Sequence, residues 1–476
     1  MMISRRAGNI LLFIGTVLVV SSVLRLSLRK SPLDPSSLYH QWTDSDPPDN
    51  DEPETWDWET TTRFSPARSS NDSSIDDAGF CDSFPSYLLP QIQVVLKIGA
   101  SESPERLDAQ LSTVTRCITN LLIVSDRESQ LHGHRVHDIL AALPQSFRAN
   151  TTEFDAYDTL QRGDGSSINS EQGWRLDRFK FLPMVERAHE INPTAQWFVF
   201  LESDTYFVWD NVFRLLDQFD PTVPLYFGSP SPGHGIDGGG RSWFAYGGAG
   251  FILSRAAVER LVERRVGAHG EYIEPPLSQR YEATVKADCC GDSVLGWALY
   301  EKGVILSGLW PMFNPHPLHG IPFEDAYWCQ PVISLHKSLL SDMRGLIEWE
   351  HQREDRTHPV VYADLFEYLQ LGTFERKPEW DNGDWGGFQE PGDSTAHTSF
   401  EACRTSCHAH SECLSYTYDH SGHCVFVRTM RLGANKPFSA EVQLSAGWDT
   451  EKIQHWRARH QCGKAEWMKP SLTRIF

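Results

Sequence analysis

Short apolar runs alternate with helix-like patterns between positions 91 and 336, and this alternation constrains the fold more than any other feature of the chain. Residues 91–99 (QIQVVLKIG) and 117–126 (CITNLLIVSD) predict two strands, with a helix over 105–116 between them. A further buried strand is predicted at 196–201 (QWFVFL), and further helices at 183–190, 211–219 and 255–265. A βαβ opening followed by alternating elements predicts an α/β sheet with helices on its faces.

Two carboxylates directly follow the predicted strand 196–201, in the sequence Glu202, Ser203, Asp204. Ligands of open α/β sheets bind beyond the carboxyl ends of the strands. A pair of carboxylates there can hold a hard divalent cation, which in turn neutralises a diphosphate. The alternative is that Ser203 and Asp204 only start a turn and cap the next helix.

The N-terminal region has a different composition. Residues 8–24 form an uncharged, mostly apolar run at the short end of what spans a bilayer, and predict a signal-anchor behind a cytosolic tail at 1–7. A cleaved signal peptide is the alternative, although no good small-x-small cleavage site follows. Residues 25–80 predict a flexible acidic stem, because 31–62 contain nine Asp or Glu, no Lys or Arg and few aliphatic residues.

Ten cysteines and the sequons at 71–73 and 150–152 indicate an oxidising secretory compartment. Four of the cysteines cluster between positions 403 and 424, as in a disulfide-stapled module. A zinc site is the alternative, but its ligand spacing would be irregular and no Cys-x-x-Cys occurs.

Pairings outside this cluster are also predicted. We expect Cys81 to link to Cys117, and Cys329 to link to Cys289 or Cys290. The adjacent Cys289 and Cys290 are expected not to pair, which leaves one of them free or joined to Cys462.

Five sequence blocks occur in a fixed order: WFVFLESDTYFVWDNVFRLL, YFGSP, FAYGGAGFILSRAAVERL, CCGDSVLGWALYEKGV and PVISLHK. In this order they resemble the Fringe-like and core 1 β1,3-galactosyltransferase-like enzymes of glycosyltransferase family 31, most closely the fungal branch. The resemblance covers roughly residues 81–337. It implies a GT-A type nucleotide-sugar-binding sheet with flanking helices at 81–390, Mn²⁺ or another divalent cation, an inverting reaction and a UDP-sugar donor.

The resemblance also implies roles for individual residues. Glu202, Ser203 and Asp204 occupy the family's Asp-x-Asp position, with Asp204 as the direct metal ligand, and His336 in SLHK completes the metal site. Glu202 departs from the usual Asp, so its contact stays open between metal, ribose and water. Asp292 matches the carboxylate that serves as general base. A helix N-cap is its other interpretation.

Donor contacts are implied for residues on both sides of this loop. Lys97 follows the first strand, Trp174 and Arg178 precede the metal loop, and Gly247 and Gly248 lie in YGGAG. Glu202 and Ser203 belong to the same donor-binding set. Glycines at such positions permit close approach of the backbone to a bound sugar. The alternatives are surface cations and a tight bend.

Residues 391–476 contain the pattern Cys-x3-Cys-x5-Cys-x10-Cys around SYTYD and resemble a PAN or apple-type module. That resemblance implies nested links, Cys403 with Cys424 and Cys407 with Cys413. It also implies a small disulfide-rich module that binds proteins or glycans. A purely structural cap on the preceding domain is the alternative.

These features predict a single-pass type II protein of the Golgi or ER membrane with a lumenal catalytic domain. It would move a hexose or N-acetylhexosamine from a UDP-sugar to a glycan or glycoprotein, forming a β1,3 linkage. The alternative is a catalytically inactive glycan- or protein-binding membrane protein. The presence of Asp204, Asp292 and His336 favours the enzyme, and the net charge of −20 disfavours nucleic acid as a partner.

Overall fold

The computed structural model describes residues 54–58, 81–163, 165–353, 355–383 and 387–475. Residues 53–476 form one compact unit. The predicted tail at 1–7 and anchor at 8–24 lie outside the described residues. Within the described ranges, no helix is both long and apolar enough to cross a membrane.

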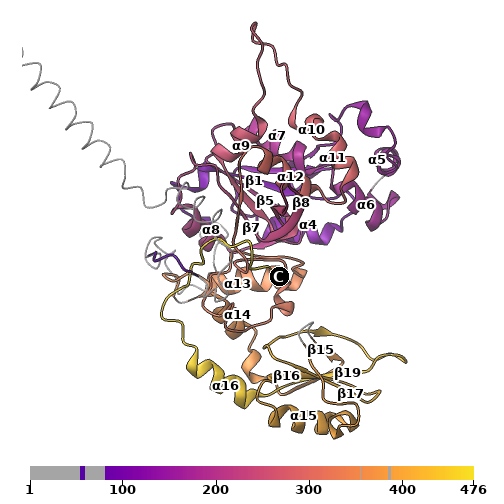
Figure 1. The fold of residues 1–476 in the computed structure, drawn as a ribbon, viewed down its shortest axis with the longest axis vertical. Helices are drawn as coiled ribbons and strands as arrows, with labels where there is room; N and C mark the ends of the chain where they lie inside the picture. Colours follow the sequence, from indigo (N-terminus) through magenta and orange to yellow (C-terminus); the bar gives the residue numbers. More distant parts are fainter. Residues whose placement is uncertain (1–53, 59–80, 164, 354, 384–386, 476) are drawn as a thin grey trace, which may run out of the picture. The chain divides into compact units, whose positions relative to one another are not determined.

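An eight-stranded sheet forms the centre of the first part of this unit (Figure 1), in the order β11-β7-β10-β5-β1-β2-β4-β3. Its strands are β1 (Ile92–Lys97), β2 (Leu121–Ser125), β3 (Ser129–Leu131), β4 (His134–Asp138), β5 (Trp197–Glu202), β7 (Tyr226–Gly228), β10 (Phe251–Ser254) and β11 (Leu306–Gly308). β1 pairs in parallel with both β2 and β5, so the predicted βαβ opening is confirmed. β10 runs antiparallel between β5 and β7, which the alternating pattern does not predict.

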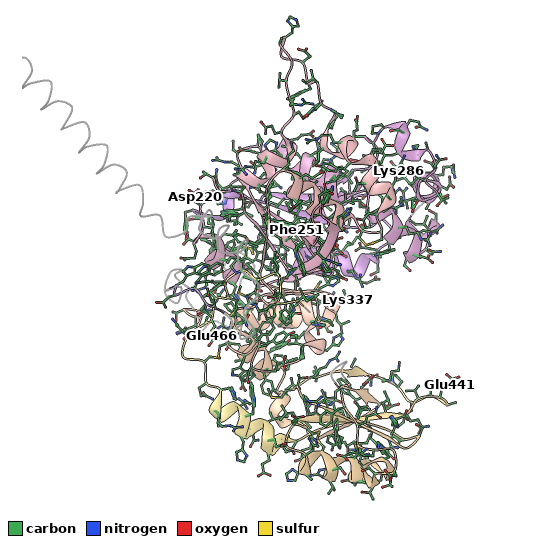
Figure 2. All side chains as sticks on the ribbon, viewed as in Figure 1. Asp220, Phe251, Lys286, Lys337, Glu441 and Glu466 are labelled. Atoms are coloured by element: carbon green, nitrogen blue, oxygen red, sulfur yellow. A yellow bond between two sulfur atoms is a disulfide. The ribbon has the colours of Figure 1, made fainter. Side chains whose placement is uncertain are left out.

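Both faces of the sheet are buried. Along β1, Ile92, Val94 and Leu96 belong to one hydrophobic core and Val95 to the other, and each is 0% exposed. Successive strand residues point to opposite faces, so a strand that is apolar throughout requires cover on both sides. Phe251, labelled in Figure 2 near the middle of the sheet, is likewise 1% exposed.

Helices supply that cover. One face is covered by α5 (Glu153–Arg162), α6 (Ser170–Asp177), α7 (Phe181–Ile191), α9 (Arg255–Val262), α10 (Leu277–Arg280), α11 (Glu282–Ala287) and α12 (Gly291–Glu301). The other face is covered by α4 (Pro104–Ser112), α8 (Trp209–Leu216), α13 (Leu340–Gln352) and α14 (Tyr362–Tyr368). The predicted α/β class, with a central sheet and flanking helices consistent with a GT-A type fold, is confirmed.

Two smaller sheets are formed by segments that follow β5 in the sequence. They shape the end of the central sheet that carries the candidate site. β6 (Tyr206–Phe207), β13 (Ser334–Leu335) and β12 (Phe313–Asn314) form a three-stranded sheet directly after the β5 loop. β8 (Pro230–Gly235) and β9 (Arg241–Ala245) form an antiparallel hairpin.

The C-terminal region has its own four-stranded sheet. It contains β14 (Arg376–Pro378), β19 (Leu444–Trp448), β16 (Ser415–Asp419) and β17 (His423–Val427), with α15 (Phe400–Ala409) and α16 (Thr450–Arg459). Disulfides join Cys403 to Cys424 and Cys407 to Cys413, in the nested order that the apple-type resemblance implies. All four sulfur-bearing residues are buried in a small core of this region.

The other disulfides correct part of the prediction. Cys81 pairs with Cys117 as expected. The prediction was wrong for the remaining four, because Cys289 pairs with Cys290 and Cys329 with Cys462. The backbone N–H of Glu466 donates to the carbonyl of Cys329 at 2.8 Å, so the C-terminal segment runs beside Cys329. This brings the Cα atoms of Cys329 and Cys462 to 5.4 Å, within disulfide range.

A short piece of the predicted stem is packed rather than free. Trp56 stacks on Trp58 at 4.2 Å, packs edge-on against Phe219, and is 6% exposed. Its backbone N–H donates to the carbonyl of Trp467 at 2.7 Å. A stem that is flexible throughout 25–80 is therefore incorrect at 54–58, because two tryptophans in this acidic stretch bury a large apolar area.

Candidate metal and catalytic site

The loop after β5 carries the predicted metal-binding carboxylates, and Thr205 holds its shape. The backbone N–H of Glu202 donates to Thr205 Oγ1 at 3.1 Å, and that hydroxyl donates to the carbonyl of Gly248 at 2.8 Å. Thr205 is 0% exposed. One buried hydroxyl thus fixes the β5 loop against the YGGAG segment, a role that was not predicted from the sequence.

His336 reaches this loop through strand pairing. β13 runs antiparallel to β6, with Leu335 opposite Tyr206. The backbone N–H of Ser338 also donates to the carbonyl of Asp204 at 2.9 Å. His336 Nε2 consequently lies 3.6 Å from Asp204 Oδ1. One ligand atom from each of Glu202, Asp204 and His336 lies within 4.8 Å of the others.

The donor set and its surroundings fit a divalent cation. Two carboxylates and one imidazole suit Mn²⁺ and similar ions. His336 is 5% exposed, and its Nδ1 has no hydrogen-bond partner among the described residues. A Cβ added at Gly248 would lie 2.3 Å from His336 Nε2, so only glycine leaves room for the ring there. The predicted ligands are thus adjacent, and their metal remains a prediction.

Asp292 lies beside the same segment, in the first turn of α12. Its Oδ2 accepts a hydrogen bond from the backbone N–H of Gly247 at 2.8 Å, and its Oδ1 accepts one from Ser293 at 2.9 Å. The helix N-cap is Cys290, so the alternative assignment of Asp292 as the N-cap is wrong. Burial raises the pKa of Asp292 to about 6, with the nearby charge of Glu202 adding to the effect. A carboxylate with this pKa can take up a proton near neutral pH.

Lys97 makes a buried ionic contact with the same loop. Its ammonium lies 3.1 Å from Glu202 Oε1 and also pairs with Asp177. Burial alone would lower the pKa of Lys97, but the two carboxylates outweigh it and raise the pKa above its ordinary value. Lys97 therefore stays charged beside Glu202, and its contact with the donor stays a prediction.

The side chain of Ser203 is hydrogen-bonded to a residue that was not predicted from the sequence. Its hydroxyl donates to Glu102, and Glu102 also accepts from the backbone N–H of Gly99 at 2.6 Å. Burial raises the pKa of Glu102 above its usual range. Glu102 comes two residues before the α4 helix, in the loop after β1. The loop after β1 lies at the same end of the sheet as Ser203, and this position was the signal that could have identified Glu102.

Two predicted donor residues are not brought to the cluster. Arg178 donates to Glu153 and to the carbonyl of Asp288, each at 2.7 Å, and its side chain is 14% exposed. It therefore fastens the end of α11 to α5. Trp174 lies on α6 with 62% of its surface exposed. No contact given for the described residues joins Trp174 to Glu202, and its donor contact stays a prediction.

Tyr246 lies among the three carboxylates. Its ring meets that of His336 edge-on, at 5.3 Å between centroids. Burial raises its pKa to about 12, and the charges of Glu202, Asp292 and Asp204 add to the rise. A neutral phenol thus lies close both to Asp292 and to the candidate metal ligands.

Comparisons with known proteins identify the region that carries these residues. Residues 119–307 match the family described as Fringe-like. The beta-1,3-N-acetylglucosaminyltransferase radical fringe of Xenopus laevis is 26% identical over 153 residues, which are 29% of this chain and 45% of that protein. The glycoprotein-N-acetylgalactosamine 3-beta-galactosyltransferase 1 of Xenopus laevis is 35% identical over 87 residues, 18% of this chain and 22% of that protein.

A third relative extends the same picture. The Fringe glycosyltransferase of Drosophila melanogaster is 32% identical over 89 residues, 16% of this chain and 21% of that protein. The chain thus spans less than half the length of these curated relatives. The matched region includes the β5 loop and Asp292, whereas His336 lies beyond it. Residues 119–307 of this α/β protein are therefore similar to Fringe-like proteins and to β1,3-glycosyltransferases.

Proposed function

We propose that the protein is an inverting, metal-dependent glycosyltransferase that moves a hexose or N-acetylhexosamine from a UDP-sugar to a glycan or glycoprotein, forming a β1,3 linkage. The observation that carries the proposal is the convergence of Glu202, Asp204 and His336 beside Asp292 at the carboxyl end of β5. The similarity of residues 119–307 to Fringe-like proteins supports the same activity.

In this proposal, Glu202, Asp204 and His336 hold a divalent cation, which when bound neutralises the diphosphate of the donor. Lys97 adds a second, permanent positive charge on the donor side. Gly247 and Gly248 leave this segment without side chains, which would collide with Phe181 and His336, and the bare backbone can approach the sugar closely.

Asp292 acts as the general base. The acceptor hydroxyl oxygen forms a bond to the anomeric carbon while the bond from that carbon to the diphosphate oxygen breaks. The hydroxyl proton passes to the Asp292 carboxylate, and the bonding electrons leave with UDP. The hydrogen bond from Gly247 keeps the carboxylate oriented during this transfer.

The remaining predictions join this proposal. They are a Golgi or ER membrane location through a single anchor at 8–24, a lumenal catalytic domain at 81–390, and an apple-like module at 391–476 that binds protein or glycan. The five disulfides support an oxidising compartment.

Incubation of the purified full-length chain with a panel of nucleotide sugars, with and without Mn²⁺, tests the activity. We expect metal-dependent release of UDP from one UDP-sugar, and faster release when a saccharide acceptor is added. Binding of glycans without turnover of any donor would instead favour an inactive glycan-binding protein.

A further inference from the structure

A cavity of ≈470 Å³ opens beside the start of α12, between the β8–β9 hairpin and α11. Its lining includes His234, Phe244, Asp288, the Cys289–Cys290 pair and Ser293. Its volume lies within the range of small-ligand pockets. Cys290 and Ser293, which line the cavity, flank the Gly291–Asp292 pair that carries the proposed base. The cavity therefore lies beside the first turn of α12, which carries Asp292.

Asp288 organises the polar side of the cavity. Its Oδ2 contacts His234 Nε2 at 2.6 Å and accepts from the hydroxyl of Ser293 at 2.9 Å, while its Oδ1 accepts from the backbone N–H of Cys290 at 3.0 Å. A carboxylate on Nε2 fixes the proton there. Nδ1 of His234 is thereby left as an acceptor, and no hydrogen bond given for the described residues engages it.

Other residues of the cavity lining are apolar, among them Phe244. Phe244 is half-buried on β9. The backbone of β9 packs directly against α12, as shown by Gly296, where an added Cβ would lie only 2.2 Å from the Cβ of Phe244. The bonded Cys289 and Cys290 have no S–H group to donate, so they present an apolar surface. An aromatic face combined with fixed polar groups suits a sugar ring, which has an apolar C–H face and hydroxyls at its edge.

We propose that this cavity binds the terminal pyranose ring of a saccharide acceptor, with His234 Nδ1 accepting from one sugar hydroxyl and Phe244 packing against the ring. This rests on the proposed transferase function and adds the acceptor class and its binding residues. The ring then lies beside Asp292, which must reach a neighbouring hydroxyl of the same sugar.

Acceptor kinetics test the proposal on the full-length protein. A panel of p-nitrophenyl glycosides identifies the best acceptor for the wild-type chain, and His234→Ala and Phe244→Ala are then compared with it. We expect the acceptor KM to rise about tenfold or more in each variant, as for loss of a buried contact. The donor KM and metal-dependent donor hydrolysis in the absence of acceptor should not change.

Two further variants separate binding from folding. His234→Gln can still donate to Asp288 and offers an acceptor oxygen, so it should recover part of the lost affinity. His358→Ala removes an exposed histidine that also contacts an aspartate, Asp355 at 2.8 Å, and should leave acceptor kinetics unchanged. A melting curve for each variant excludes global unfolding as the cause.

Ligand-detected NMR with the same glycosides and UDP gives a reading that does not need turnover. Saturation transfer to the best glycoside should be seen with the wild type and should weaken in His234→Ala. An unchanged acceptor KM in both cavity variants, or no glycoside binding to the wild type, overturns the proposed site. Donor hydrolysis that persists in that case leaves the transferase proposal standing, whereas its absence from the wild type contradicts the transferase itself.

Discussion

Two groups of buried charges lie around the ends of β1 and β5, and they differ in how well they neutralise each other. In the first, Lys180 lies 3.1 Å from Asp126 and 3.2 Å from Asp177, and both Lys180 and Asp126 are almost fully buried. Burial alone would lower the pKa of Lys180, but the two carboxylates outweigh it and raise the pKa. Lys97 also pairs with Asp177, so with Lys97 counted this group has two cations for two carboxylates and is balanced within the protein.

The second group consists of Glu202, Asp204, Asp292 and His336, and it carries an excess of negative charge. Lys97 is shared between Glu202 and Asp177, and half-exposed Arg106 lies 3.8 Å from Asp204. Burial of charge alone does not mark a binding site, because a paired network can be purely structural. The unbalanced group is the one that a cation would complete.

Loss of a ligand from the unbalanced group should have the largest effect. Asp204→Ala and His336→Ala should each reduce metal-dependent transfer to background, because the site must neutralise a diphosphate. Melting temperatures should stay close to that of the wild type. Assays over a range of Mn²⁺ concentrations measure this, and full activity in both variants would contradict the metal assignment.

The balanced group should respond in stability instead. Lys180→Met leaves the buried Asp126 without its cation and leaves Asp177 with Lys97 alone, and it should cost about 3–5 kcal/mol in the free energy of unfolding. Lys469→Met is the matched control, since Lys469 forms an exposed pair with Glu54 at 2.9 Å, worth less than about 1 kcal/mol. Denaturant unfolding measures both, and equal losses would remove the distinction between the two groups.

Asp292→Asn separates proton transfer from structure. The amide keeps the shape but cannot take the acceptor's proton, so turnover should fall by about a hundredfold or more with donor affinity nearly unchanged. Calorimetric titration of the donor and a transfer assay measure the two quantities. Near-normal transfer with a lowered melting point would refute the catalytic role.

The raised pKa of Asp292 also sets a pH dependence. The base must be deprotonated to act, so wild-type turnover should decline as the pH falls through about 6, and a bound cation would shift the midpoint lower. The residual turnover of Asp292→Asn should not show this decline at low pH. If the decline at low pH persists in Asp292→Asn, the titrating group must be a different residue.

Glu202→Asp should have the smallest effect. Shortening the side chain keeps a carboxylate near the cation but weakens the 3.1 Å contact with Lys97. We expect transfer to stay within about tenfold of the wild type, as for loss of one charged hydrogen bond. A much larger loss in the kinetic assay would show that the longer side chain has a contact of its own with the donor.

Much of the central fold was predictable from sequence, because its signals are local. The buried strand 196–201 and the helix 183–190 appear as β5 and α7 with small shifts at their ends. Side-chain alternation and helical periodicity depend on neighbours in the chain. The antiparallel β10 was not predictable, because strand direction depends on pairing with β5 and β7 across the sheet.

The candidate site divides in the same way. The placement of Glu202 and Asp204 at the end of a buried strand could be predicted from the sequence, because this prediction depends on the local pattern alone. The position of His336 beside them was implied by family resemblance alone, and it depends physically on the pairing of β13 with β6.

The partners of the remaining groups can be seen in the tertiary structure alone. It ties Arg178 to Glu153, joins Ser203 to Glu102, and pairs Cys289 with Cys290. The charge of an arginine and the thiol of a cysteine are present in the sequence whatever their partners. Their partners depend on long-range packing, which local periodicity does not encode, and that packing distinguishes a structural ion pair from a group free to meet a ligand.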